Sequence, residues 1–230
     1  MTSGTPLLKR MIHTFDQDRF PFVGRVSEMF GGTDLARLDH CAVVHPPPGT
    51  TDQATEAHTR FYAGFDGIRG MYHDFLRTYI LPLFSGDVCV QAVPTFRVCP
   101  PGGVAVSTFH RDADFHHQPG TVNFWLPLTP AFGTNSIWIE SAADRGDYQP
   151  VNLVPGEVLQ FDAITLRHGN MANDTGACRV SFDFRVIPLD RFEDTGLSTV
   201  TSGTPMRLGA YYMVMENPPA GASPAPRVAS

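Results

Sequence analysis

The sequence predicts a mainly β jelly-roll fold with helices packed on its outside. Short β-type runs, separated by Pro, Gly, Asn and Asp, follow one another after Gly86, and a segment with helical periodicity precedes them. The chain has 230 residues, of which 42% are hydrophobic, so it can bury one substantial core. We therefore expect a single domain over residues 1–215, with a jelly-roll core at about 87–188 and a helical part at 27–85.

The helical part is expected to be one long helix that follows the Pro-rich stretch "HPPPGTTDQ" and starts at a cap on Thr51 or Asp52. Six apolar residues recur there at steps of four and three, which is typical of a stripe that faces a core. They are Phe61, Phe65, Ile68, Tyr72, Phe75 and Tyr79. Residues 1–53 are expected to be irregular apart from one short helix at about 27–39, and the Pro- and Ala-rich tail at 216–230 to be disordered.

The strands are placed by short β-type runs between turn residues. We expect them near 87–93, 95–99, 104–112, 121–128, 136–140, 157–162, 164–168 and 178–187.

Charge and composition limit the classes of binding partner that fit this chain. The formal net charge is −6 and the 17 Lys and Arg residues form no basic run, which argues against nucleic acid or an anionic membrane. No stretch approaches the ~18 apolar residues of a spanning helix, and the first twenty residues lack an apolar signal core, so we expect a cytoplasmic protein with a small-molecule partner. The four cysteines lack C-x-x-C spacing, so neither a disulfide framework nor a zinc knuckle is indicated. The oligomeric state stays open.

A histidine and a carboxylate stand two residues apart in "GGVAVSTFHRDADFHHQPG". In a strand over 104–112, His110 and Asp112 would project from the same face, at a separation where they can share one cation. The spacing alone is a weak signal, because a chain with nine histidines produces it by chance, and an exposed or mutually hydrogen-bonded pair explains it equally well. Asp114 is a weaker alternative ligand, since it lies more than one pleat from His110.

A second segment, "PGEVLQFDAITLRHGNMANDTGACRVSFDFRV", predicts a hairpin with His168 at its mouth, at the end of strand 164–168. On the return strand Arg179, Ser181, Asp183 and Arg185 alternate with Val and Phe, so these polar groups share one enclosed face. Buried arginines need anionic partners. Asp183 can satisfy one of the two arginines, and the other is left for a carboxylate from elsewhere.

Two histidines and one aspartate on adjacent strands form the facial triad expected of non-haem Fe(II) oxygenases. Zn²⁺ could occupy such a site but would not exploit the open positions. Arg179 offers a guanidinium fork for the far end of a dicarboxylate, with Ser181 as a hydroxyl donor, and Arg185 is its rival on the same face. His110, Asp112 and His168 are thus the candidate catalytic and metal-binding residues.

This pattern resembles the Fe(II)/2-oxoglutarate-dependent dioxygenase superfamily, in its phytanoyl-CoA-dioxygenase-like branch. The phrases "FHRDADFHH", "VNFWLPLT", "NSIWIES" and "RVSFDFRVIP" further resemble the small oxygenases of streptomycin- and orthosomycin-type antibiotic biosynthesis. The resemblance covers about residues 87–188. It implies a double-stranded β-helix, cupin-like, with iron at its mouth, 2-oxoglutarate as cosubstrate and O₂ as oxidant.

The resemblance also implies the reaction. 2-Oxoglutarate would chelate the iron and be converted to succinate while a C–H bond of a saccharide substrate is oxidised. In orthosomycin-type relatives a neighbouring hydroxyl then closes a ring, as an orthoester or methylenedioxy bridge. Asn123 is expected to face the cosubstrate, with a core hydrogen bond as the alternative. Asp112 disfavours a halogenase, which would carry Gly or Ala at that position.

Several residues outside the motif have open roles. His116 and His117 either contact substrate or form a solvated loop, and Tyr211 and Tyr212 are expected to fold over the opening. Two other functions compete with the saccharide oxygenase: a hydroxylase of another small metabolite, and a cupin-like sugar-binding or isomerase protein without oxygen chemistry. Jelly rolls host many activities, so the fold alone does not decide among these functions. The oxygenase is favoured because the three metal-ligand candidates occur together with Arg179, which can bind a dicarboxylate.

Overall fold

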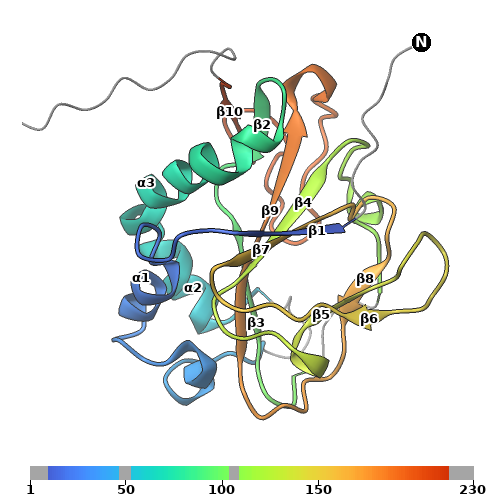
Figure 1. Ribbon diagram of the computed structural model, residues 1–230. Helices are drawn as coiled ribbons and strands as arrows, with labels where there is room; N and C mark the ends of the chain where they lie inside the picture. The colour runs from blue at the N-terminus through green and yellow to red at the C-terminus, as the bar shows by residue number, and fades with distance from the viewer. Residues whose placement is uncertain (1–9, 47–52, 104–108, 218–230) are drawn as a thin grey trace, which may run out of the picture.

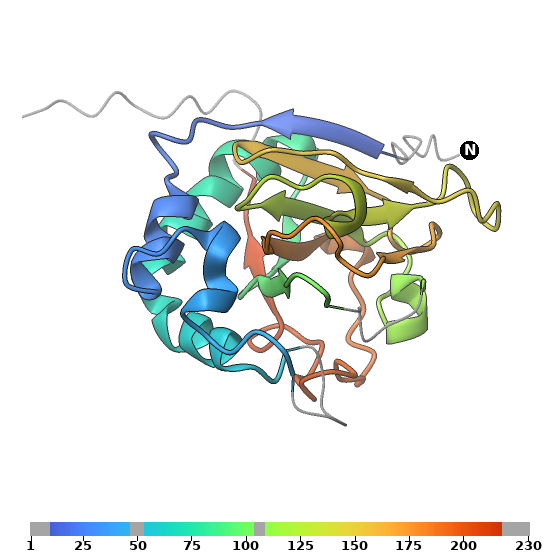
Figure 2. The same cartoon turned by 90° about the horizontal axis from the view of Figure 1, so that it is seen from below.

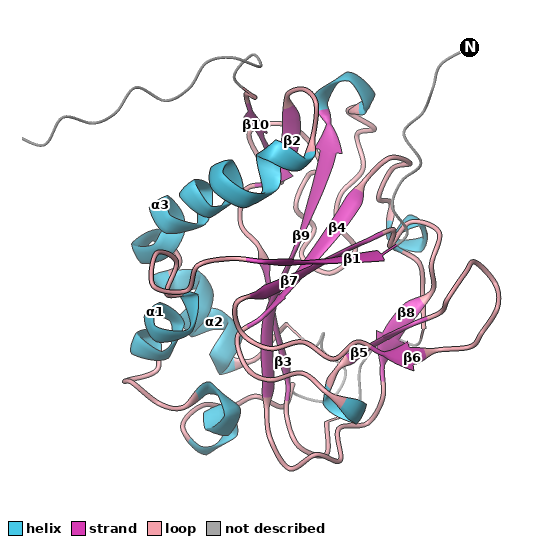
Figure 3. Ribbon diagram, viewed as in Figure 1, coloured by secondary structure: helices cyan, strands magenta, loops and turns pink. Residues whose placement is uncertain are grey.

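Two antiparallel sheets form the body of the computed structural model, which describes residues 10–46, 53–103 and 109–217 (Figures 1 and 3). The larger sheet has the order β1 (Arg10–Thr14), β7 (Glu157–Phe161), β4 (Val122–Pro127), β9 (Arg179–Pro188), β2 (Val88–Gln91) and β10 (Tyr212–Met215), and β3 (Thr95–Cys99) also pairs with β9. The smaller sheet has the order β6 (Gln149–Pro150), β5 (Ile137–Ile139) and β8 (His168–Asn170). The predicted mainly β fold with flanking helices is confirmed.

The helices gather on one side of the larger sheet, as Figure 2 shows. They are α1 (Phe22–Met29), α2 (Glu56–Gly64) and α3 (Asp66–Phe75), and α3 continues through a π-helical turn (Leu76–Ile80) and a 3-10 turn (Leu81–Leu83). Further 3-10 turns cover Leu35–His40, Asp112–Phe115, Gly133–Asn135 and Leu189–Arg191. In the described part of the chain no helix is both long and apolar enough to span a membrane.

The two faces of β9 divide the molecule into a core side and a site side. One face belongs to the main core under the helices and consists of Val180, Phe182, Phe184 and Val186. The Phe182 ring there lies 5.3 Å from that of Phe61, which stacks at 4.3 Å on Phe96. The expected apolar stripe of the helical part is confirmed, because its members from Phe61 to Phe75 are buried in this core. The opposite face of β9 therefore turns its polar residues away from the helices.

Strand register places the polar side chains in rows across this opposite face. Asn123 on β4 lies opposite Arg185 on β9, and Trp125 lies opposite Asp183. On the other edge of β9, Arg97 of β3 lies opposite Ser181. Since directly opposed residues of an antiparallel pair project to the same side, these groups converge on the space enclosed by the two sheets.

One predicted strand is wrong at its end, and another is wrong as a whole. Residues 104–108 of the expected strand 104–112 lie outside the described residues, and within the remainder Asp112 begins a 3-10 turn. The expected strand at 164–168 is instead a turn, because Oδ1 of Asp162 accepts hydrogen bonds from the backbone N–H groups of Ile164 and Thr165. His168 consequently starts β8 rather than ending a strand.

The amino-terminal region is more ordered than expected, since β1, α1 and the turn at Leu35–His40 occupy it. The single long helix is also wrong. The residues expected as its cap lie outside the described part, and α2 begins instead after Thr55, whose side chain accepts from the His58 N–H. Glycines at 64 and 67 flank the point near Phe65 where α2 gives way to α3, which fits the low helix propensity of glycine. Most of the tail at 216–230 lies outside the described residues.

Candidate active site

Three potential metal ligands converge between the sheets. His110, Asp112 and His168 each offer one ligand atom, and these atoms all lie within 4.8 Å of one another. Asp112 is 2% exposed and His168 is 8% exposed, so the group lies inside the protein. Asp114, the weaker alternative, is exposed and caps the 3-10 turn by accepting from the Arg111 N–H, so it does not join this group.

Backbone hydrogen bonds hold the three residues in place. His110 and His168 exchange backbone hydrogen bonds in both directions, at 3.0 and 2.9 Å, and so form an isolated antiparallel bridge. The N–H of Asp112 donates to the carbonyl of Ala163 at 2.8 Å. The carboxylate therefore reaches the two imidazoles from a 3-10 turn, and not from the second pleat of a strand as the sequence suggested.

The imidazole of His168 is oriented by the main chain. Its Nδ1 lies 3.1 Å from the carbonyl oxygen of Leu166, which can only accept a hydrogen bond. Nδ1 therefore carries the proton and Nε2 has the lone pair. Nε2 is also the atom that faces Oδ1 of Asp112, at 3.6 Å. A histidine fixed in this way by a backbone carbonyl is the usual arrangement of a metal ligand.

Asp112 is held as a carboxylate. Burial alone would raise its pKa, but the adjacent Arg185 guanidinium holds the pKa well below its usual range. An ionised carboxylate with two imidazoles is a hard, mixed O and N donor set. It fits Fe(II) or another divalent first-row metal.

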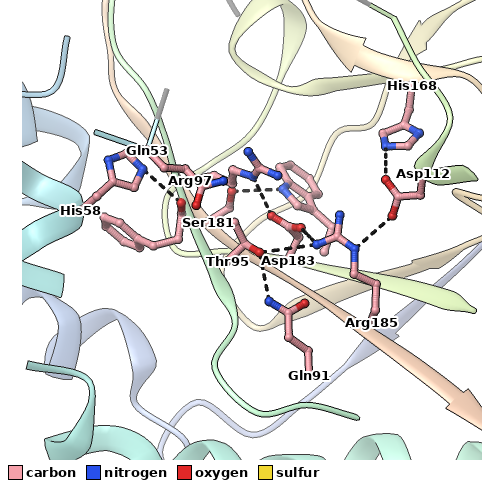
Figure 4. Close-up of polar contacts among 12 residues, drawn as sticks. Gln53, His58, Gln91, Thr95, Arg97, Asp112, His168, Ser181, Asp183 and Arg185 are labelled. Carbon is pink, nitrogen blue, oxygen red and sulfur yellow. Dashed lines mark hydrogen bonds and ion pairs between the residues drawn. The ribbon is translucent and has the colours of Figure 1, made fainter. Parts of the chain in front are cut away.

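Arg185 links Asp112 to a wider buried network, shown in Figure 4. Its Nε donates to Oδ2 of Asp112 at 3.0 Å, and its Nη1 contacts Asp183 and Thr95. Asp183 also accepts from Nε of Arg97 at 2.8 Å. Burial favours the neutral acid, but Arg97 and Arg185 together hold the pKa of Asp183 below its usual range. The carboxylates of Asp112 and Asp183 are thus both paired with guanidinium groups.

Arg179 and Ser181 form a second polar group on the same strand face. Arg179 is 3% exposed, and it donates from Nε to the carbonyl of Asn135 and from Nη1 to Oγ of Ser181. Ser181 also accepts from Nε1 of Trp125 at 3.0 Å. Because Oγ of Ser181 accepts two hydrogen bonds, its own O–H remains as a donor. Arg179 lines the cavity described next and can present its guanidinium there, whereas Ser181 is buried and is not among the residues that line that cavity.

A cavity of about 860 Å³ joins these groups. The triad, Arg179, Asn123 and Arg185 all line it. Among the described residues, its Arg and Asp lining consists of three arginines and two aspartates, which leaves an excess of one positive charge before any metal is added. The volume is large enough for a small dicarboxylate together with a larger organic molecule. The positive excess suits an anionic cosubstrate.

Two buried polar atoms at the cavity wall have no hydrogen-bond partner among the described residues. They are Oδ1 of Asn123 and Nδ1 of His117. Burial, and then the charge of Arg185, lower the pKa of His117 to about 4, so this imidazole is neutral at pH 7. Buried polar groups ordinarily have partners, so these two atoms indicate where a bound molecule supplies them.

Sequence reasoning missed part of this site. The role of Arg185 as a partner of Asp112 was not predicted, although the alternation along β9 placed its side chain on the correct face. Segments 44–46 and 199–204 also line the cavity, and no motif marks either of them. The two tyrosines expected over the opening do not act as a pair: Tyr211 lines the cavity, whereas Tyr212 packs in a separate apolar cluster with Cys89 and Met206.

Comparison with known proteins identifies a relative. No protein-family model matches the chain. The streptomycin biosynthesis protein StrG of Streptomyces griseus is 39% identical over 201 residues, which is 86% of this chain and 94% of that protein. The chain belongs to the StrG family.

Solved structures show which fold this StrG family member has. The non-heme monooxygenase ThoJ, in its nickel complex, superposes with a TM-score of 0.51 at 14% identity, over 91% of this chain and 80% of ThoJ. SnoK, a non-heme alpha-ketoglutarate-dependent carbocyclase from nogalamycin biosynthesis, gives 0.50 at 11% identity, over 89% and 91%. EctD from S. alaskensis, with 2-oxoglutarate and 5-hydroxyectoine, gives 0.51 at 16% identity, over 86% and 76%. The jelly-roll fold of non-heme oxygenases is therefore confirmed.

Proposed function

We propose that the protein is a non-haem Fe(II)/2-oxoglutarate-dependent oxygenase of the phytanoyl-CoA-dioxygenase-like branch, acting on a saccharide natural product. The observation that carries this proposal is the convergence of His110, Asp112 and His168 within 4.8 Å, inside a cavity that also contains Arg179. The fold, shared with non-heme oxygenases, and the relationship to a streptomycin biosynthesis protein both support it.

The triad residues would hold the iron. His168 would contribute Nε2, since its Nδ1 donates to Leu166, and Asp112 would contribute Oδ1, since Arg185 occupies Oδ2. His110 would complete one face of the metal, leaving the other positions for exogenous ligands. When bound, Fe(II) with 2-oxoglutarate and O₂ supplies the oxidation of a substrate C–H bond, and 2-oxoglutarate leaves as succinate and CO₂.

Arg179 would anchor the far carboxylate of 2-oxoglutarate, with Ser181 as the second donor. Arg185 is the weaker candidate, because its Nε and Nη1 already bind Asp112 and Asp183. Asn123 lies beside Arg185 in the sheet register and faces the cavity, where it can contact the cosubstrate. The remaining volume would hold the saccharide with its target carbon near the triad. Ring closure onto a neighbouring hydroxyl is the product we favour, and hydroxylation is the alternative.

Succinate formation tests the proposal. Protein loaded with Fe(II) is mixed with 2-oxoglutarate, O₂ and a panel of oligosaccharide-antibiotic precursors, and succinate and sugar products are quantified. We expect at least one precursor to raise succinate formation in step with loss of two hydrogens from the sugar, or with gain of one oxygen atom for a hydroxylase. Sugar isomerisation that proceeds without 2-oxoglutarate and O₂ would contradict the proposal and favour a cupin-like isomerase.

A further inference from the structure

The two walls of the cavity differ in charge. Every arginine and aspartate that lines it in the described part of the chain comes from β3, β9 or the turn at Asp112. The facing wall is built by residues from 44–46, 53–62 and 199–211, and its described lining residues include no Asp, Glu, Lys or Arg. They are Val44, His45, Pro46, Gln53, Tyr62, Thr199, Val200, Thr201, Ser202, Thr204, Ala210 and Tyr211. Figure 2 shows the orange to red segment after β9 on the side of the larger sheet opposite β1.

The uncharged wall is rich in hydroxyl groups that are already ordered. Oγ1 of Thr199 lies 2.7 Å from Oγ of Ser202, which lies 2.8 Å from Oγ1 of Thr204. The backbone N–H of Thr204 donates to Oγ1 of Thr199 at 3.0 Å. Hydroxyls can both donate and accept, so such a row matches the hydroxyl groups of a sugar or another polyol.

His117 lies where this wall meets the metal site. It is 8% exposed, lines the cavity, and its Nδ1 has no hydrogen-bond partner among the described residues. Its backbone N–H donates to the carbonyl of Asp112, and the positive φ of His116 (71°) turns the chain between them. The His117 ring lies 5.9 Å from the ring of Tyr211. The buried Nδ1 of His117 thus has an unmet hydrogen-bonding capacity close to the triad.

Both ends of the segment 193–211 are fastened to the core of the site. At its start, Gln118 and Glu193 exchange side-chain to backbone hydrogen bonds at 3.1 and 2.8 Å. At its end, the hydroxyl of Tyr211 donates to Oε1 of Gln91 at 2.8 Å. The uncharged wall is therefore tied at one end to the turn that carries His117, and at the other to β2.

We infer that His117, Tyr211 and the Thr199–Thr204 hydroxyls form the subsite for the reacting ring of the substrate, and that this ring is uncharged and hydroxylated. This inference rests on the proposed function. Both carboxylates among the described lining residues already pair with arginines, so a cationic ring would have no unpaired carboxylate there, and the described residues of the uncharged wall offer no Lys or Arg to an anionic ring. Nδ1 of His117 would exchange a hydrogen bond with a ring hydroxyl, and Tyr211 would present its ring face.

Ligand-observed NMR tests the subsite on protein loaded with Zn(II), a diamagnetic substitute for iron, and 2-oxoglutarate. Three matched probes are compared: methyl α-D-glucopyranoside, D-glucosamine and D-glucose 6-phosphate. We expect saturation transfer to the neutral glycoside and at least about 10-fold weaker binding of the two charged sugars. His117→Phe and Tyr211→Ala should each weaken binding of the glycoside about 10-fold, the equivalent of one buried hydrogen bond or one stacking contact.

Two variants serve as controls. His117→Asn keeps a polar atom at the position of Nδ1 and should restore most of the affinity, which separates a lost contact from a misfolded site. His13→Phe, on β1 and hydrogen-bonded to Gln160, should bind the glycoside like the wild type.

The inference is overturned if a charged sugar binds as tightly as the neutral one, if His117→Phe and Tyr211→Ala leave glycoside binding unchanged, or if no glycoside binds. Failure of the proposed function looks different. In that case Zn(II) and 2-oxoglutarate do not bind. Binding of the glycoside to the metal-free protein and its variants then still tests whether the subsite exists.

Discussion

Nε of Arg185 donates to Oδ2 of Asp112 at 3.0 Å, while Oδ1 of the same carboxylate faces Nε2 of His168 at 3.6 Å. The two oxygens of Asp112 therefore have different neighbours. The guanidinium holds one, and the other is directed at the histidines. Arg185 thus orients the carboxylate as a ligand through a single oxygen, and a bond to its other carboxylate partner, Asp183, fixes Arg185 in turn.

Removing Arg185 is expected to destabilise the protein strongly. Arg185→Met leaves Asp112 without its arginine partner and leaves Asp183 with Arg97 alone. Breaking a buried ion pair in this way costs about 3–5 kcal/mol in the free energy of unfolding. Arg97→Met is the matched control. Its side chain is 32% exposed and Asp183 keeps Arg185, so about 1 kcal/mol is expected. Urea unfolding of the metal-free variants measures both losses, and equal losses would contradict the central position assigned to Arg185.

Replacing a triad residue should abolish metal binding without unfolding the protein. His168→Ala removes one ligand, and we expect affinity for Fe(II) or Ni(II) to fall by more than about 100-fold, beyond the usual effect of losing an outer-shell partner. Isothermal titration calorimetry measures the affinity and circular dichroism checks the fold. His13→Ala, a histidine on β1 far along the sheet from β9, should bind metal like the wild type. Retained affinity in His168→Ala would remove this residue from the site.

Arg179 should govern cosubstrate affinity alone. In Arg179→Ala we expect the Kd for 2-oxoglutarate to rise about 100-fold, because a charge-assisted pair is lost, while metal affinity is retained. Arg179→Lys keeps the charge but not the fork, so an intermediate value is expected. Titration of the Ni(II)-loaded protein measures the affinity. An unchanged Kd in Arg179→Ala would contradict this role and would instead assign binding of the far carboxylate to Arg185.

Glu140 should stabilise the loop that leads into His168. One carboxylate oxygen accepts from the Arg167 N–H at 2.7 Å and the other from the Gly146 N–H at 3.2 Å. Glu140→Gln places an amide donor against these N–H groups, and we expect a loss of about 2 kcal/mol at pH 7. Glu28→Gln, at an exposed ion pair, should change stability by less than about 0.5 kcal/mol.

The effect of Glu140 should also depend on pH. Burial favours the neutral acid, but backbone hydrogen bonds from Arg167, Gly146, Asp144 and Arg145 hold the pKa of Glu140 below its usual range. Because the folded pKa is lower than the unfolded one, the stabilisation is present above the ordinary Glu pKa and is lost as the pH falls through the folded value. The difference between wild type and Glu140→Gln should therefore shrink below about pH 4. A difference that grows on acidification would contradict this explanation.

The sequence predicted the strands and their faces better than the turns between them. Alternation along β9 is a local, period-two signal, so it correctly separated the Phe182 and Phe184 face from the Arg179 and Arg185 face. The turn at Asp162 depends on one side chain accepting two backbone N–H groups, and hydrophobic pattern does not reveal that. For this reason His168 was placed at the end of a strand, although it begins β8.

The candidate site shows the same division. The sequence named the three residues that converge, but it derived their convergence from a strand geometry that Asp112 does not have. What brings the carboxylate to the imidazoles is the bridge between His110 and His168 and the bond from Asp112 to Ala163, and these contacts join positions more than fifty residues apart. Such long-range backbone pairing, like the wall contributed by segment 199–211, leaves no signal in local spacing.

The visible spectrum of the anaerobic complex tests the central claim most directly. Folded protein is titrated with Fe(II) and then with 2-oxoglutarate in the absence of O₂, beside His168→Ala as control. We predict a weak metal-to-ligand charge-transfer band in the wild type that needs both additions and is missing from His168→Ala. A folded wild type that shows no such band with both additions would contradict the account of His110, Asp112 and His168 as an iron site that binds 2-oxoglutarate.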